Sequence, residues 1–285
     1  MYNLLITTPQ LQTLQQQGTT VAVLDASFDL TKPDSADLNF QAEHIAGALQ
    51  AHLDRNLSAH DARLAVNGGR HPLPQREQVA QWLGQMGIDN ATQIVVYDRN
   101  ASQYCGRLWW MLKWLGHDAV AVLDGGLQAW KAQGGALASG PATSGPATTF
   151  LIKPPLRQLV LMQTVASQLG RPTQTIVDAR AVVRYRGDVE PLDPIAGHIP
   201  GALNRPFTDN FTADGHFKSA NVLKAEWEQV LAGRDASTVV HHCGSGVTAI
   251  PNLLAMELAG YSPTALYAGS WSEWSRTAGL PCAQG

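Results

Sequence analysis

The stretch "TVVHHCGSGVTAIPNLLAMELAG", residues 238–260, indicates both the fold class and the first candidate for chemistry. It opens with β-branched residues typical of a buried strand, and from Val247 onward it has the composition of a helix that ends at glycine. Between these two elements lie Cys243 and two glycines, Gly244 and Gly246, which adopt backbone angles that other residues resist. The stretch therefore predicts a strand, a tight loop that begins with cysteine, and a helix.

The same landmarks occur twice along the chain. The run "VLDAS" with Asp25 returns as "IVDAR" with Asp178, and "EHIAGAL" with His44 returns as "GHIPGAL" with His198. Further on, "VLDGGLQAW" in the first half corresponds to "YAGSWSEW" in the second. Their common order predicts two copies of one domain.

Within each copy, short β-branched runs alternate with helical patterns. This alternation predicts an α/β fold in which each copy is a mostly parallel sheet with helices on both faces. The segment "GGALASGPATSGPATTF" between the copies has the composition of a linker. We expect one domain at residues 1–138, a linker at 139–154 and a second domain at 155–285.

Composition excludes several classes of protein. Of the 285 residues, 45% are hydrophobic and 15% are charged, and the net charge is −3, which favours a well-packed globular protein. Without a basic run or a long apolar stretch, we expect no nucleic-acid partner and no membrane partner. Three cysteines without C-x-x-C spacing indicate neither a disulfide framework nor a zinc site, so we expect a cytoplasmic protein without metal or cofactor.

The loop that follows Cys243 has the features that activate a thiol. The nucleophile is the thiolate, and a free cysteine has a pKa near about 8.5. The N–H groups of a glycine-rich loop and the positive end of the following helix both favour an anion. The alternative is that Cys243 is a small buried packing residue in a plain turn.

Other assignments for the cysteines and histidines are weaker. We expect Cys105 to lie in the core and Cys282 to be incidental in the C-terminal tail. Cysteine phosphatases need an arginine six positions after the cysteine, where this chain has Ala249. His241 and His242 are adjacent on a strand and point to opposite faces, so they make a poor metal-chelating pair.

The loop "CGSGVTA", together with a first copy that lacks the cysteine, resembles the tandem-domain rhodanese-like sulfurtransferases, which include the 3-mercaptopyruvate and thiosulfate sulfurtransferases. The landmarks "HIAGA", "HIPGALN", "GHDAVAVLDGG" and "GSWSEW" match the same family, so the resemblance covers nearly the whole chain. It implies two tandem rhodanese-like domains and a covalent, two-step transfer. The Cys243 thiolate takes sulfur from a donor as a persulfide and passes it to an acceptor such as cyanide, a small thiol or thioredoxin.

The resemblance also implies roles for particular residues. It gives Ser245 a catalytic role with His71 and Asp54, and it assigns Arg184 to the anionic group of the donor. We expect the loop residues Gly244, Gly246, Val247 and Thr248 to contact the substrate. Asp98 stands in the first copy where Cys243 stands in the second, and it cannot carry sulfur.

The choice of donor rests on charge. Many mercaptopyruvate enzymes have a second substrate arginine shortly after the first, and here that position is Leu192. Thiosulfate enzymes usually have basic residues in the cysteine loop, whereas this loop is neutral. A neutral loop favours the monoanion 3-mercaptopyruvate, with thiosulfate:cyanide transfer as the alternative. A second alternative is a persulfide carrier or docking module without turnover.

Overall fold

The structure, a computed structural model, describes residues 1–285, and the chain forms two compact units. The first unit comprises residues 1–58, 74–156 and 213–217, and the second comprises residues 59–73, 157–212 and 218–285. Each unit therefore includes a short segment from the other half of the sequence. The predicted domain boundaries at residues 138 and 155 remain a prediction.

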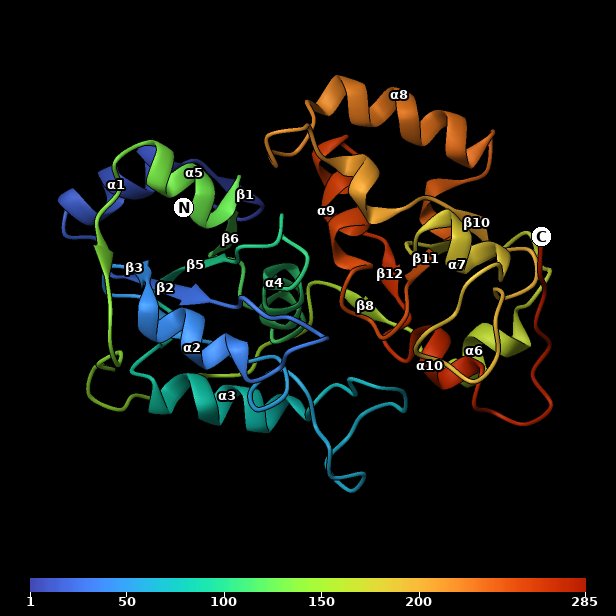
Figure 1. Ribbon diagram of the computed structural model, residues 1–285, viewed down its shortest axis with the longest axis horizontal. Helices are drawn as coiled ribbons and strands as arrows, with labels where there is room; N and C mark the ends of the chain where they lie inside the picture. The colour runs from blue at the N-terminus through green and yellow to red at the C-terminus, as the bar shows by residue number, and fades with distance from the viewer. The chain divides into compact units, whose positions relative to one another are not determined.

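The first unit is built on a five-stranded sheet in the order β1-β6-β5-β2-β4, and all its neighbouring strands are parallel (Figure 1). A two-stranded antiparallel sheet, β3 with β7, completes the unit. The strands are β1 Leu5–Ile6, β2 Val21–Asp25, β3 His44–Ile45, β4 Leu49–Gln50, β5 Gln93–Tyr97, β6 Val120–Leu123 and β7 Leu137–Ala138. The helices are α1 Thr8–Gln16, α2 Ser35–Ala42, α3 Arg76–Gln85, α4 Cys105–Trp114 and α5 Gly126–Ala132.

Side chains along each strand point alternately to the two faces of this sheet, and those on one face form a buried core. Val23, Val95 and Ala121 come from β2, β5 and β6 and lie in one buried cluster with Leu11 of α1 and Trp130 of α5. Figure 1 shows α1 and α5 on one side of the strands, with α2 and α3 on the other. Because both faces are covered, the central strands are mostly apolar, as expected for a parallel sheet.

The second unit repeats this arrangement. Its sheet has the order β8-β12-β11-β9-β10, again with every neighbouring pair parallel. The strands are β8 Gln158–Leu159, β9 Thr175–Asp178, β10 Leu203–Asn204, β11 Val239–His242 and β12 Ala265–Leu266. The helices are α6 Met162–Ser167, α7 Val182–Arg186, α8 Ala220–Leu231, α9 Ile250–Leu258 and α10 Ser270–Trp274, with 3-10 turns η1 Phe207–Asn210 and η2 Ala236–Thr238.

Equivalent residues in the two units make equivalent contacts. His44 pairs with Ala138 in an antiparallel bridge in the first unit, and His198 pairs with Ala283 in the same way in the second. The predicted fold class, two repeated α/β domains with mostly parallel sheets, is confirmed.

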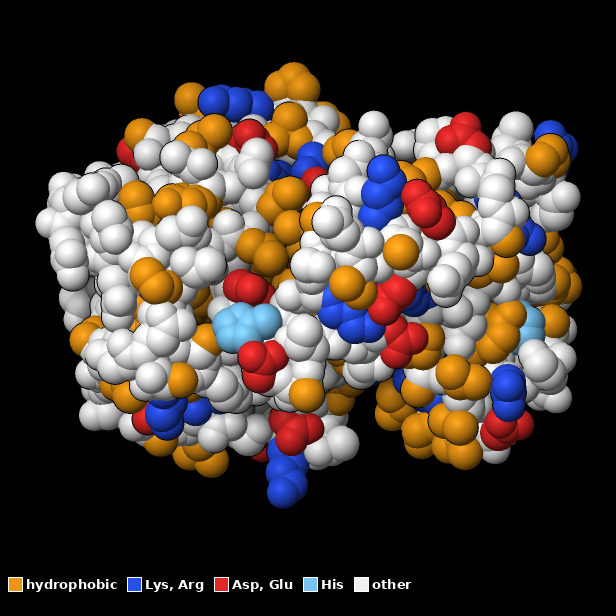
Figure 2. Space-filling model, turned by 90° about the horizontal axis from the view of Figure 1, so that it is seen from above, with side chains coloured by type: hydrophobic (Ala, Val, Ile, Leu, Met, Phe, Trp, Pro, Cys, Tyr) orange, Lys and Arg blue, Asp and Glu red, His pale blue; other side chains and the backbone are white.

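No helix of the chain combines the length and the apolar character that crossing a bilayer requires. On the face shown in Figure 2, acidic and basic side chains are interspersed.

The predicted helix after the cysteine loop begins later than expected. The sequence predicts a helix from Val247, whereas α9 starts at Ile250. Gly246 has a φ of +71°, and the Val247 carbonyl accepts a hydrogen bond from the Ile250 N–H in a turn. The left-handed glycine keeps the residues before Ile250 in the loop, so the loop is longer than its composition suggests.

The two adjacent histidines of β11 lie in different surroundings. His241 is fully buried with its ring edge-on to Trp227 of α8, and neither ring nitrogen has a hydrogen-bond partner. Nε2 of His242 lies 3.6 Å from Oδ2 of Asp178 on the neighbouring strand β9. Burial lowers the pKa of His241 from 6.5 to about 3.

This burial predicts a specific acid sensitivity. Between pH 6.5 and about 3 the unfolded chain binds a proton at His241 that the folded chain does not, so stability falls as the pH drops. The loss is about 1.4 kcal/mol per pH unit in that window. His241→Phe removes this contribution, so the decrease in melting temperature from pH 7 to pH 5, measured by calorimetry, should be smaller than in the wild type. The same replacement at the exposed His60 serves as control, and an unchanged decrease in His241→Phe would contradict the prediction.

Candidate active site

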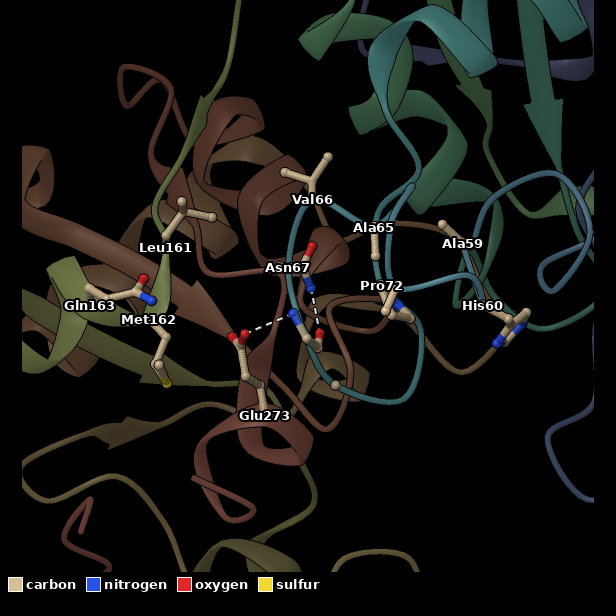
Figure 3. A pocket seen from close by; sticks show the side chains of 13 residues that line it. Ala59, His60, Ala65, Val66, Asn67, Pro72, Leu161, Met162, Gln163 and Glu273 are labelled. Carbon is tan, nitrogen blue, oxygen red and sulfur yellow. Dashed lines mark hydrogen bonds between the residues drawn. The ribbon is translucent and has the colours of Figure 1, made fainter. Parts of the chain in front are cut away.

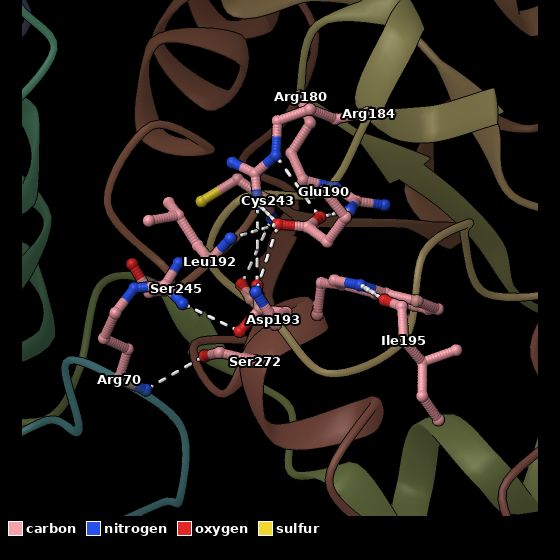
Figure 4. A network of polar contacts seen from close by, with 12 residues as sticks. Arg70, Arg180, Arg184, Glu190, Leu192, Asp193, Ile195, Cys243, Ser245 and Ser272 are labelled. Atoms are coloured by element: carbon pink, nitrogen blue, oxygen red, sulfur yellow. Dashed lines mark hydrogen bonds and ion pairs between the residues drawn. The ribbon is translucent and has the colours of Figure 1, made fainter. Parts of the chain in front are cut away.

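Cys243 lies at the carboxyl edge of the second sheet, directly after β11. Its 1% exposure makes it a buried thiol. Ligand sites of parallel α/β sheets occur at this edge, where loops from neighbouring strands meet. The Cys243 thiolate is among the charges that raise the pKa of Arg180, so the sulfur lies close enough to this guanidinium to interact with its charge (Figure 4).

The backbone of the cysteine loop is fixed by the start of α10. The carbonyl oxygens of Cys243 and Gly244 accept hydrogen bonds from the N–H groups of Trp271 and Ser272, at 3.0 and 2.8 Å. The N–H of Cys243 donates to Oγ of Ser270 at 3.1 Å. In a trans peptide the C=O and the following N–H point in opposite directions. The N–H groups of Gly244 and Ser245 therefore point away from α10.

The first unit shows which kind of group such a loop accommodates. In the β2–β5 pair Asp25 is opposite Tyr97, and in the β9–β11 pair Asp178 is opposite His242, so Asp98 and Cys243 occupy equivalent positions. The Asp98 carboxylate accepts four backbone hydrogen bonds, at 2.8 to 3.0 Å, from Asn100, Ser102, Tyr104 and Cys105. Burial raises the pKa of this carboxyl, and the N–H groups of Cys105, Asn100 and Tyr104 oppose that shift. In the first unit the loop thus encloses its own anion.

Arg180 and Asp178 form a buried ion pair close to Cys243. Arg180 donates from Nε and Nη2 to the Asp178 carboxylate, and its guanidinium lies 4.8 Å from the ring centroid of Trp271. Burial opposes the charge of Arg180, but Asp178, Glu190 and the Cys243 thiolate raise its pKa. The Arg180 guanidinium therefore remains charged beside Cys243.

Ser245 and His71 form the second element of the site. Oγ of Ser245 lies 2.8 Å from Nδ1 of His71, and both side chains are buried. His71 is carried by the 59–73 segment of the second unit, which α10 holds in place. The Gly68 N–H donates to Oε1 of Glu273 at 2.7 Å, and the Arg70 N–H donates to Oγ of Ser272 at 2.9 Å.

A cavity of about 540 Å³ lies on the same segment and is shown in Figure 3. Its wall includes the hydrogen bond from Gly68 to Glu273, and Met162 and Gln163 of α6 form the opposite side. None of its lining residues belongs to the cysteine loop. We therefore place the candidate active site at Cys243 and not in this cavity.

Arg184 has its own carboxylate partners. It is in α7 and donates from Nη2 to Oε1 of Glu190 at 2.6 Å, with Oδ2 of Asp193 at 3.5 Å. A β-carbon placed on Gly244 would lie 3.6 Å from Nη1 of Arg184. This guanidinium is therefore both anchored by carboxylates and close to the backbone of the cysteine loop.

The second unit brings together most of the predicted site residues. These are His71, Arg184, Cys243, Gly244, Ser245, Gly246, Val247 and Thr248. Val247 is buried and Thr248 is half-buried. Asp54 belongs to the first unit, and its catalytic role remains a prediction.

Sequence reasoning missed several residues that shape this site. They are Arg70, Arg180, Glu190, Asp193, Ser270, Ser272 and Glu273. Two signals were present in the sequence. Arg70 directly precedes the candidate His71, and the three α10 residues belong to the repeated landmark "GSWSEW".

Comparisons with known proteins show what this chain is similar to. A family model described as a rhodanese-like domain matches residues 7–133 and 161–277. A probable 3-mercaptopyruvate sulfurtransferase of Pseudomonas aeruginosa is 44% identical over 282 residues, which cover 97% of this chain and 98% of that protein. A putative thiosulfate sulfurtransferase of Mycobacterium tuberculosis is 35% identical over 281 residues, covering 99% and 97%. The crystal structure of a 3-mercaptopyruvate sulfotransferase from Escherichia coli matches with a TM-score of 0.79 and 29% identity, covering 95% and 100%.

Proposed function

Because this chain belongs to the rhodanese-like domain family, we propose that it is a sulfurtransferase that moves sulfur from an anionic donor through a persulfide on Cys243. 3-Mercaptopyruvate is the favoured donor. The observation that carries the proposal is the loop of Cys243, whose carbonyls are bound to α10 so that its N–H groups face the opposite side. Such a loop stabilises a sulfur-borne negative charge.

The first half-reaction transfers the donor sulfur to the enzyme. The Cys243 thiolate attacks the sulfur of 3-mercaptopyruvate, and an S–S bond forms as the C–S bond breaks. The electron pair of the C–S bond goes to the methylene carbon as the enolate of pyruvate. The thiol proton of the donor is transferred to that carbon, which yields pyruvate and the Cys243 persulfide anion. The Ser245 hydroxyl, hydrogen-bonded to His71, relays this proton, and Asp54 completes the relay.

The second half-reaction returns the enzyme to its starting state. An acceptor attacks the outer sulfur of the persulfide, the S–S bond breaks and the Cys243 thiolate leaves. Cyanide yields thiocyanate, and a thiol yields its persulfide. We propose a thiol acceptor in the cell, with thioredoxin as one candidate, and a cytoplasmic setting, which sparse cysteines favour.

Charge supports the choice of donor. The ion pairs around the loop join four arginines to three carboxylates, so one positive charge is in excess. The Cys243 thiolate balances that excess, so a monoanion brings one uncompensated negative charge to the site, whereas the dianion thiosulfate brings two. The arginines are 70, 180, 184 and 276, and the carboxylates are Asp178, Glu190 and Asp193.

Kinetics with both donors test the proposal. With cyanide as acceptor and thiocyanate as readout, kcat/KM for 3-mercaptopyruvate should exceed that for thiosulfate by about tenfold or more, the effect of one unfavourable charge contact of about 1.4 kcal/mol. The reverse order would support the alternative, thiosulfate:cyanide transfer, which the 35% identity to the putative mycobacterial thiosulfate sulfurtransferase favours. Persulfide formation without turnover would indicate a carrier. An enzyme that gains no sulfur from either donor would refute the proposal.

A further inference from the structure

We infer that Glu273 is a positioning residue for proton transfer, because it holds the 59–73 segment so that His71 meets Ser245. The inference rests on the proposed function and deepens it, since it makes the need for Glu273 depend on the donor. Transfer from 3-mercaptopyruvate uses the Ser245–His71 pair, and transfer from thiosulfate does not. Loss of Glu273 should therefore slow the first reaction and spare the second.

Residues 68–71 form the tip of a closed loop. The Val66 N–H donates to the Leu73 carbonyl at 2.9 Å, and the Leu73 N–H donates to Oδ1 of Asn67 at 3.1 Å. These two hydrogen bonds join the ends of the loop, and the tip itself makes neither of them. The tip, with His71 at its end, therefore needs contacts from outside the loop to take one position.

The helix α10 supplies these contacts. Oε1 of Glu273 accepts a hydrogen bond from the Gly68 N–H at 2.7 Å, shown in Figure 3, and Oγ of Ser272 accepts one from the Arg70 N–H at 2.9 Å. A hydrogen bond to a carboxylate is stronger than one to a neutral hydroxyl. Glu273 is therefore the stronger of these two anchors of the tip backbone.

The tip and the start of α10 approach too closely for additional side chains. A β-carbon on Gly68 would lie 2.8 Å from Oε1 of Glu273, and one on Gly69 would lie 2.7 Å from the Gly269 carbonyl oxygen. A β-carbon on Gly269 would overlap Oε2 of Glu273. The carboxylate thus fits between glycines of both segments, which restricts the tip to one arrangement.

The same helix also holds the cysteine loop. Ser270, Trp271 and Ser272 make hydrogen bonds to the backbone of Cys243 and Gly244. Ser270 is fully buried and has a φ of +56°, a left-handed conformation that persists in a non-glycine residue only where the surrounding contacts impose it. The helix α10 therefore holds the loop of the nucleophile and the loop of the histidine on one support.

Only one of the two donors requires a proton transfer. With 3-mercaptopyruvate, the electron pair of the breaking C–S bond goes to the methylene carbon, which takes up the proton of the donor thiol. With thiosulfate, the Cys243 thiolate attacks the outer sulfur, the S–S bond of the donor breaks, and its electron pair leaves on sulfite without any proton. A displaced His71 should therefore affect the first reaction only.

Steady-state kinetics with both donors and cyanide test the role of Glu273. Glu273→Ala should lower kcat with 3-mercaptopyruvate by about 30-fold, part of the about 10²- to 10⁴-fold that positioned proton transfer contributes, and change kcat with thiosulfate by less than about threefold. The single-turnover reaction of the preformed persulfide with cyanide also moves no proton, so its rate should stay unchanged. Glu273→Gln keeps an acceptor oxygen for the Gly68 N–H and should restore most of the turnover.

The second unit contains a matched control. Glu257 has a buried side chain whose Oε1 accepts a hydrogen bond from Nε of Arg157 at 2.6 Å. Glu257→Ala therefore removes a buried carboxylate of the same unit without touching the tip, and it should keep the wild-type ratio of the two donor rates. Equal losses with both donors in Glu273→Ala would overturn the inference, because they would indicate a general structural defect.

A double variant tests whether Glu273 acts through His71. His71→Ala should lower kcat with 3-mercaptopyruvate at least as much as Glu273→Ala does. Adding Glu273→Ala to His71→Ala should lower kcat by less than about threefold further, because no histidine is left to position. Full multiplication of the two effects would contradict the inference.

Hydrogen exchange separates this inference from the proposed function, because it needs no turnover. In Glu273→Ala the amides of residues 68–71 should exchange at least about tenfold faster than in the wild type and in Glu257→Ala. Unchanged exchange at the tip would overturn the role of Glu273. A wild type that transfers no sulfur, with faster exchange at the tip in Glu273→Ala, would instead refute the proposed function and leave the anchoring of the tip by Glu273 intact.

Discussion

Replacing Cys243 by serine abolishes sulfur transfer, with turnover falling by at least about 10⁴-fold. A serine oxygen remains protonated at neutral pH and cannot carry the transferred sulfur as a persulfide. The change in volume is small, and the hydrogen bonds that hold residue 243 use its backbone N–H and C=O. The variant should therefore keep the melting temperature of the wild type to within a few degrees.

The chain offers its own control for this prediction. Cys282 is a free thiol with partial exposure, and Cys282→Ser should retain full turnover. After incubation with donor, intact-mass spectrometry should find one added sulfur atom in the wild type and in Cys282→Ser, and none in Cys243→Ser. Substantial turnover by Cys243→Ser, or added sulfur located on Cys282, would contradict the assignment of the nucleophile.

Gly246→Ala should destabilise the second unit by about 3 kcal/mol and reduce turnover by about 100-fold. A β-carbon on Gly246 would lie 2.2 Å from the carbonyl oxygen of Ala268, at a φ of +71°. The left-handed conformation costs a side chain about 1–2 kcal/mol, and the steric overlap adds about as much. Ala268 cannot yield easily, because the N–H of the preceding Tyr267 donates to the His241 carbonyl at 2.9 Å. The loop must move instead, and a displacement of about 1 Å in an active site can cost about 100-fold.

Gly233→Ala is a control that introduces the same backbone strain as Gly246→Ala without displacing the cysteine loop. Gly233 has a φ of +83°, and a β-carbon there would meet nothing within 4 Å. Gly233→Ala should therefore lose only about 1–2 kcal/mol and keep its turnover. Melting temperature and kcat are measured for both variants. Equal turnover in Gly246→Ala and Gly233→Ala would show that the left-handed glycine of the cysteine loop has no role in placing the sulfur.

Features that depend on neighbouring residues could be predicted from the sequence, whereas contacts between distant residues could not. The repeat, the parallel strands and the position of Cys243 between β11 and α9 could be predicted, because alternation, helical composition and glycine act over a few neighbouring residues. The start of α9 was predicted three residues too early, since the φ of Gly246 depends on the packing of the loop against Ala268. Ser245 and His71 were also expected together, but through a family resemblance and not through residue spacing.

The sequence by itself determined a repeated α/β chain with one cysteine at the carboxyl end of a central strand. Only the tertiary structure decided what surrounds that cysteine. Arg70 meets Asp193 across 123 residues of sequence and Ser272 across 202, and His71 meets Ser245 across 174. No periodicity reaches over such distances, because these contacts exist only once the sheet has brought separate loops to one edge. The charge of the site, and with it the choice of donor, is therefore a property of the folded chain.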